Sequence, residues 1–158
     1  MKPLLRSVTL GLALLVAAGA AQTALPPTPA VTSPGERAAL TRGRALVADF
    51  YAVRVDRVWQ AFTPEVRAEW GNVAALRAFR EAGVRTYGAE RRVLRERTFT
   101  DAGVTYYVRS ATFERDPETV WAVVFGFDAA GRVQLFTIAA EDGEASPGRV
   151  AHRRLWTA

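Results

Sequence analysis

The stretch VWAVVFGFDAAGRVQLFTIAAE, residues 120–141, has two apolar runs on either side of the turn-forming residues DAAG at 128–131. Runs rich in valine, phenylalanine and isoleucine around such a turn are typical of a β-hairpin. The run from Thr119 to Phe127 is apolar on both faces, so we expect it in the centre of a sheet. One of these faces carries three aromatic residues: Trp121, Phe125 and Phe127. We expect that face to pack against helices.

Two further strands are predicted before this hairpin. Turn residues at 101–103 and 116–118 bound strands near 90–99 and 104–114, and the last strand covers 132–140. The strand near 90–99 carries arginine on both faces, so we expect it at an edge of the sheet, where charge discourages further pairing. Connections this short imply a four-stranded antiparallel meander.

The first and longest helix is predicted from its capping sequence. Ser33 as N-cap, Pro34 at the first helical position and Glu36 form a capping box. Apolar side chains then recur at helical spacing as far as Val53.

Shorter helices are predicted between this helix and the strands. Residues 56–62 form one, and Thr63-Pro64-Glu65 repeats the cap-and-proline signature for another that ends near Trp70. Asn72 can cap a further helix, for which we expect Gly83 to supply the C-terminal stop. Four residues alternate around the apolar stripe of this helix: Val73, Leu76, Phe79 and Arg80. Helices followed by hairpins predict an α+β domain, with N-terminal helices packed on a curved, cone-like, antiparallel four-stranded sheet.

The start of the chain is typical of an export signal. Lys2 and Arg6 precede an uncharged apolar run from Val8 to Ala18, which is too short to span a bilayer and is followed by small residues. The chain has no cysteine to carry a lipid anchor. We therefore expect a protein that is periplasmic or secreted, is not a lipoprotein and has no stable membrane insertion after cleavage.

These signals divide the chain into four segments. We expect a signal peptide at 1–21, a proline-rich linker at 22–33, the cone-like α+β domain at 34–141 and a C-terminal tail at 142–158. With no cysteine, the domain must be held together by packing alone.

The segment from about Glu36 to Glu141 resembles the nuclear-transport-factor-2-like (NTF2-like) superfamily, a cone of helices closing over a strongly bent sheet. The resemblance is carried by ALVADFYAVRVDRVWQAFTPEVRAEW at 45–70 and by the hairpin at 120–141. Within the superfamily the chain is similar to small exported bacterial proteins of unknown function and to modules placed ahead of serine hydrolase domains. Because the superfamily includes ketosteroid-isomerase-like and SnoaL-like enzymes beside non-catalytic binding and dimerisation domains, the resemblance implies a fold rather than a function.

The composition excludes several chemistries. Without cysteine, and with His152 in the tail as the one histidine, the chain has no Cys/His zinc cluster and no cysteine nucleophile. The one lysine, Lys2, leaves with the signal peptide, so a Ser-Lys hydrolase site is absent too. No glycine-rich turn lies between a strand and a helix, as a phosphate loop requires. We expect neither a metal nor a cofactor.

Carboxylates and tyrosines remain as candidate functional groups. Asp49 and Asp56 lie near the end of the first helix, and three tyrosines lie further on: Tyr87, Tyr106 and Tyr107. Their spacing is not specific to any reaction. A pocket between the first helix and the sheet would be apolar, with few polar groups on its walls. We expect four ligand-binding residues: Tyr51, Tyr107, Arg109 and Trp121.

These observations favour an exported, non-catalytic accessory domain that binds a small apolar ligand or an envelope protein. One alternative is a small acid-base enzyme, isomerase-like or SnoaL-like, that uses aspartate and tyrosine groups. Another is a structural domain that forms a homodimer through its sheet. A nucleic-acid partner is not expected, because arginines are interspersed with acidic residues along the chain.

Overall fold

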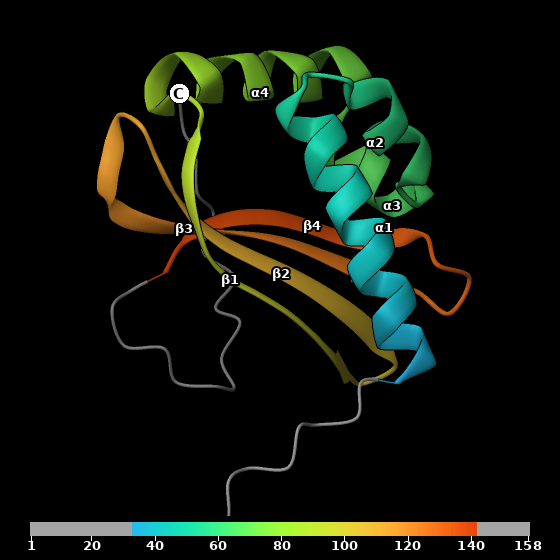
Figure 1. Cartoon of the computed structure of the whole chain (residues 1–158). Coiled ribbons are helices and arrows are strands. Elements are labelled where there is room, and N and C mark those ends of the chain that lie inside the picture. Colours follow the sequence, from blue (N-terminus) through green and yellow to red (C-terminus); the bar gives the residue numbers. More distant parts are fainter. Residues whose placement is uncertain (1–32, 142–158) are drawn as a thin grey trace, which may run out of the picture. The chain divides into compact units, whose positions relative to one another are not determined.

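A computed structural model describes residues 33–141, which lie within one compact unit (Figure 1). Four helices precede four strands: α1 (Pro34–Tyr51), α2 (Val55–Ala61), α3 (Pro64–Trp70), α4 (Val73–Tyr87), β1 (Glu90–Asp101), β2 (Val104–Phe113), β3 (Asp116–Phe127) and β4 (Val133–Ala140). The α+β order predicted from the sequence is confirmed. The predicted signal peptide, most of the linker and the tail with His152 lie outside the described residues and stay predictions.

The helix starts follow the predicted caps. Ser33 Oγ accepts a hydrogen bond from the Glu36 amide, and the Glu36 carboxylate accepts one from the Ser33 amide, each at 3.1 Å. Thr63 caps α3, and Asn72 Oδ1 accepts from the Ala75 amide at 2.9 Å. Each cap satisfies an amide that has no partner within its helix.

The expectation that Gly83 ends its helix is wrong. Helix α4 continues to Tyr87 and ends at Gly88, whose φ of 75° lies in the left-handed region. A glycine stops a helix where the backbone enters that region, and Gly83 is not among the residues with positive φ. Gly83 is instead an interior helical residue without a side chain.

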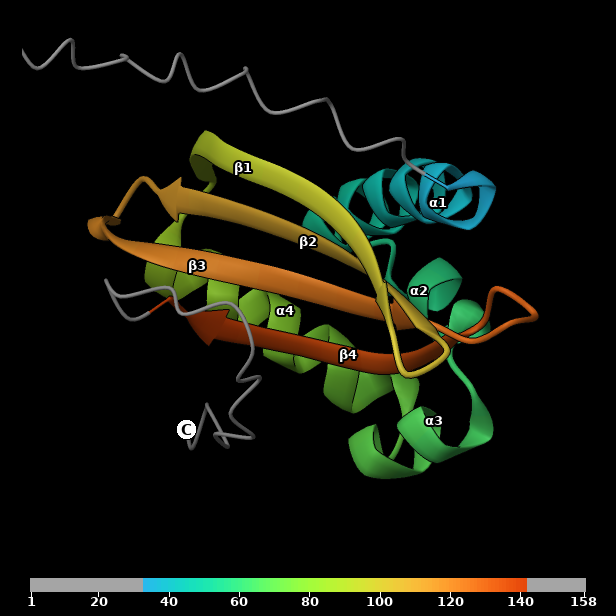
Figure 2. The ribbon, with the colours of Figure 1, turned by 90° about the horizontal axis from the view of Figure 1, so that it is seen from below.

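The strands form one antiparallel sheet in the order β1-β2-β3-β4, which confirms the meander (Figure 2). Strand β1 lies at an edge and β3 lies inside, as predicted. The sheet is not strongly curled, in contrast to the bent sheet that the resemblance implied. Most of its register shifts lie near strand ends, and one lies further inside β1, between Val93 and Arg95.

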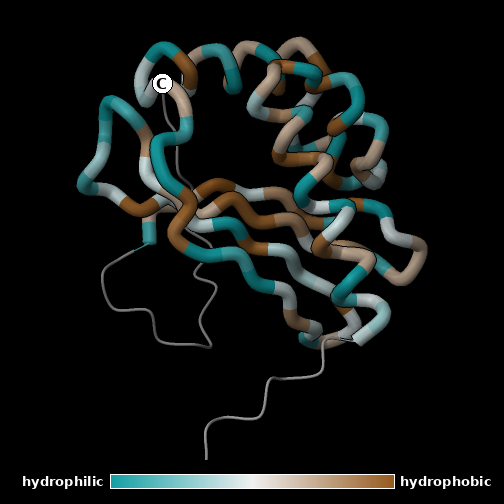
Figure 3. Tube along the Cα trace, in the orientation of Figure 1, coloured by the Kyte–Doolittle hydropathy of each residue, from teal (hydrophilic) through white to brown (hydrophobic). Residues whose placement is uncertain are grey.

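The helices cover one face of the sheet, and the core lies between them (Figure 1). Phe125 and Phe127 are buried there, as expected for the aromatic face of β3. The Phe125 ring stacks on Phe136 of β4 at 4.9 Å between centroids, and Phe136 meets Phe50 of α1 at 5.3 Å. Figure 3 shows hydrophobic positions recurring along the central strands and the helices. Aromatic packing across the layers therefore joins sheet and helices.

Helix α1 lies directly on the ring of Tyr107 in β2. A Cβ atom added at Gly43 would lie 2.3 Å from Tyr107 Cγ, much closer than non-bonded carbon atoms approach. Tyr107 is fully buried beneath the helix. Gly43 is therefore required by the close approach of the helix backbone to the sheet.

This contact predicts opposite effects for one substitution at two interior helical glycines. Alanine normally stabilises a helix interior by roughly 1 kcal/mol relative to glycine. We expect Gly83→Ala to show such a gain, because its Cβ meets only Arg80 Nη1, at 3.6 Å. Gly43→Ala should instead destabilise the domain by about 1–3 kcal/mol through overpacking. Urea unfolding measures both, and a gain at both positions would contradict the close packing of α1 on Tyr107.

Candidate functional site

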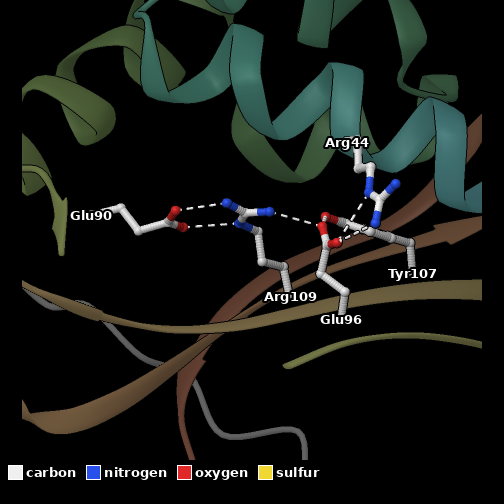
Figure 4. A network of polar contacts seen from close by, with 5 residues as sticks. All are labelled: Arg44, Glu90, Glu96, Tyr107 and Arg109. Atoms are coloured by element: carbon white, nitrogen blue, oxygen red, sulfur yellow. Dashed lines mark hydrogen bonds and ion pairs between the residues drawn. The ribbon is translucent and has the colours of Figure 1, made fainter. Parts of the chain in front are cut away.

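Five side chains form a polar cluster where α1 meets β1 and β2: Arg44, Glu90, Glu96, Tyr107 and Arg109 (Figure 4). Glu96 is its centre. One carboxylate oxygen of Glu96 accepts hydrogen bonds from Arg44 Nε and Nη2 at 3.0 and 2.7 Å. The other accepts from Tyr107 Oη at 2.6 Å and from Arg109 Nη1 at 2.8 Å. Arg109 also binds Glu90 through two parallel hydrogen bonds of 2.9 and 2.6 Å.

Mutual neutralisation sets the electrostatics of this polar cluster. Hydrogen bonding from Arg44 is the main cause that holds the pKa of Glu96 at about 2, with Tyr107 and Arg109 adding to the effect. Burial and the neighbouring Glu96 raise the pKa of Tyr107, and hydrogen bonding to Glu90 raises that of Arg109. Two carboxylates balance two guanidinium groups, so the polar cluster is satisfied internally. It fastens α1 to the sheet and has no excess charge for a ligand.

The polar cluster predicts acid sensitivity that depends on Glu96. Because its folded-state pKa of about 2 lies below the ordinary value of 4.5, its contribution to stability is complete above about pH 5 and is lost as the pH falls towards 2. Over that interval the native protein should lose roughly 1–3 kcal/mol more stability than Glu96→Gln. Urea unfolding at several pH values measures the difference. The exposed Glu118 offers a control, since Glu118→Gln should follow the native protein.

A small cavity lies beside the polar cluster, between the end of α1, helix α4 and the sheet. Its volume is about 40 Å³, roughly three times the space that one water molecule needs. Its walls are almost wholly apolar and come from five elements: Phe50 and Tyr51 of α1, Phe79, Arg80, Gly83 and Tyr87 of α4, Phe113 of β2, Trp121 and Val123 of β3, and Ile138 of β4. The cavity therefore lies at the layer boundary, where side chains from distant parts of the sequence converge.

The four residues predicted to bind a ligand divide between these two places. Tyr51 and Trp121 line the cavity. Tyr107 and Arg109 lie in the polar cluster, where their polar atoms already bind Glu96 and Glu90. Sequence spacing could not separate the two pairs, because their surroundings depend on which side chains of distant elements meet in space.

Tyr51 connects the cavity with the polar cluster. Its ring lines the cavity and meets Phe113 edge-on at 6.0 Å. Its Oη atom is buried without a hydrogen-bond partner among the described residues. Burial is the main cause that raises the pKa of Tyr51, and nearby Glu90 raises it further although the two groups do not meet in hydrogen-bonding geometry. The hydroxyl is therefore neutral at physiological pH and unsatisfied.

The sequence analysis missed Arg80 as a functional candidate. Arg80 is 7% exposed as a residue, and its guanidinium lies over the rings of Phe50 and Tyr51, 5.3 and 5.0 Å from their centroids. Nε donates to the Phe50 carbonyl at 3.0 Å and Nη2 to the Tyr51 carbonyl at 3.2 Å. The available signal was a charged residue within the apolar stripe of a predicted helix.

The aspartates considered for acid-base work lie elsewhere. Asp49 accepts from Arg54 at 2.7 Å, and Asp56 accepts from Arg77 at 2.6 Å. Neither aspartate is among the residues that line the cavity. Both carboxylates therefore stabilise the junction between α1, α2 and α4.

Within residues 33–141 there is no group of three or more acidic, histidine or cysteine side chains that could hold a metal ion. The helices of this part are also too short or too polar to cross a membrane. Comparisons with protein-family models, with curated proteins and with solved structures found no match for the chain. Its function is therefore inferred from the chemistry of its own residues.

The two tyrosines should respond differently to loss of the hydroxyl. Tyr107→Phe removes a hydrogen bond to a charged acceptor, so we expect a loss of about 1.5–3 kcal/mol in the free energy of unfolding. Tyr51→Phe removes a buried hydroxyl that has no partner, so stability should stay the same or rise by up to about 1 kcal/mol. Denaturant unfolding of both variants tests the assignment, and a large loss in Tyr51→Phe would show that its hydroxyl is satisfied.

Proposed function

We propose that this chain is an exported, non-catalytic binding domain that holds a small ligand with an apolar body in the cavity between α1, α4 and the sheet. The cavity is the observation that carries the proposal. Protein interiors are close-packed, and an apolar hollow with few polar groups is the usual form of a small-molecule site. With a volume of about 40 Å³, the cavity encloses only part of a ring or short chain, so the rest of the ligand would lie at the mouth.

The resemblance to the NTF2-like superfamily supports the same proposal. In that superfamily the space between helices and sheet is where ligands are bound, and the cavity of this chain lies between the corresponding layers. A role beside a cell-envelope enzyme belongs to the proposal as well. It rests on the export signal expected from residues 1–21 and on the similarity to modules that precede hydrolase domains.

The two alternative functions have less support. An acid-base enzyme needs a carboxylate that can reach the ligand, whereas Glu90 is held by two hydrogen bonds from Arg109 and both aspartates near α1 are paired with arginines. A homodimer through the sheet would use apolar surface, of which Val93 and Leu94 on edge strand β1 expose 39% and 42%. Two exposed apolar residues are too few for a dimer interface.

A plug in the cavity tests the proposal. Gly83 lines the cavity, and a side chain there would extend into space bounded by Arg80. We expect toluene, indole and benzyl alcohol to shift the NMR signals of cavity residues in the native protein. The same compounds should not shift the NMR signals of the Gly83→Leu variant, because the leucine side chain fills the cavity.

Thr86→Leu is the matched control, since Thr86 is exposed on the same helix. It adds an equal apolar side chain outside the cavity, so binding should persist. If Gly83→Leu and Thr86→Leu bind the compounds equally well, the binding site lies outside the cavity. Absence of binding to the native protein by every compound would overturn the proposed function.

A further inference from the structure

Arg80 is the one charged residue among the buried residues of the part of the chain that the structure describes. No carboxylate within residues 33–141 forms an ion pair with it, and burial lowers its pKa. Arginine nevertheless stays protonated in proteins. Burying a cation is unfavourable unless a partner offsets the loss of hydration. The wall of the cavity therefore carries one positive charge without a counter-ion.

Part of this charge is offset by the end of α1. The Phe50 and Tyr51 carbonyls accept hydrogen bonds from Nε and Nη2, and the negative end of the helix dipole lies there. The aromatic rings beneath the guanidinium add a cation–π contribution. These contacts explain a structural role in which Arg80 caps α1, but they leave Nη1 without a hydrogen-bond partner among the described residues.

A neighbouring arginine shows what a purely structural contact looks like here. Arg77, one turn earlier on α4, donates to the Val53 carbonyl at 3.2 Å and also binds the Asp56 carboxylate at 2.6 Å. Arg77 thus joins α4 to the segment that follows α1. It lies at the surface, and the Asp56 carboxylate neutralises its charge. Arg80 makes the same kind of carbonyl contact in a buried position without a carboxylate.

The free nitrogen of Arg80 lies on the cavity side. A Cβ atom at Gly83 would lie 3.6 Å from Nη1, and both residues line the cavity. The other groups on the cavity wall are aromatic or aliphatic, and the Tyr51 and Tyr87 hydroxyls are kept neutral because burial raises both pKa values. Among the described residues, no group on the wall carries a negative charge that would compete with a ligand anion for Nη1.

We propose that the ligand is a small monocarboxylate, whose carboxylate binds Arg80 Nη1 while its ring or short chain lies against the aromatic wall. The inference rests on the proposed function and names its ligand class. One negative charge matches the one uncompensated cation, and a charge-assisted hydrogen bond in an apolar surrounding is stronger than a neutral one. An uncharged ligand of equal shape leaves the guanidinium unpaired.

Matched ligands test this inference on the native protein. Benzoate and benzamide have nearly the same shape but differ in charge, as do hexanoate and hexanamide. We expect each carboxylate to bind at least tenfold more tightly than its amide, measured from the NMR shifts of the Gly83 amide and the Trp121 indole. Equal affinity within a pair would overturn the carboxylate inference and leave the proposed function standing. If no member of either pair binds while toluene does, the carboxylate inference alone falls; if toluene, indole and benzyl alcohol fail as well, both fall.

A pair of variants assigns the preference to Arg80. Arg80→Gln keeps a side-chain donor for the α1 carbonyls but removes the charge, so benzoate affinity should fall at least tenfold, to that of benzamide. Benzamide affinity should not change. Arg77→Gln loses a charge from the same helix and should keep the preference for benzoate. If Arg80→Gln still binds benzoate more tightly than benzamide, Arg80 is not the residue that binds the carboxylate. If this variant does not fold, the comparison of carboxylates with amides on the native protein tests the inference by itself.

Discussion

The contact between Gly43 and the ring of Tyr107 is the constraint on which the rest of the domain depends. It places the α1 backbone against β2 without an intervening side chain. Arg44, the next residue, then reaches Glu96 on β1. Two turns further along α1, Phe50 lies on the same helix face and meets Phe136 of β4. One close approach therefore positions both the polar cluster and the end of α1 that borders the cavity.

The polar cluster and the cavity differ in how their charges are satisfied. In the polar cluster two glutamates and two arginines neutralise one another, and Tyr107 donates to the shared carboxylate. Rearranging such a network would break several satisfied hydrogen bonds at a large cost in free energy, as is typical of a structural contact. On the cavity wall, Arg80 has carbonyl oxygens and aromatic rings as neighbours but no carboxylate. The imbalance of charge, rather than the number of polar groups, distinguishes a candidate binding site from a structural one.

Local signals predicted the elements because they act over a few residues. The capping box at Ser33, the cap at Asn72 and the turn at 128–131 each depend on hydrogen bonds between near neighbours in the chain. Gly83 shows the limit of this approach, since glycine both ends helices and permits close packing within them. Whether a glycine ends the helix or lies within it depends on whether the next helical turn can pack against the sheet. In this chain it does, and α4 continues to Tyr87.

The sequence by itself determined the α+β order, the strand order, the edge position of β1 and the buried face of β3, since period and turn chemistry are properties of short segments. It also singled out Tyr51 and Trp121, both of which line the cavity. Only the tertiary structure decided that Tyr107 and Arg109 belong to a saturated polar cluster, and that Arg80 lies on the cavity wall without a carboxylate partner among the described residues. The reason is that charge compensation depends on which side chains meet across the layers. Arg77 and Arg80 look alike in the sequence, yet within residues 33–141 Arg77 binds a carboxylate and Arg80 binds only carbonyl oxygens.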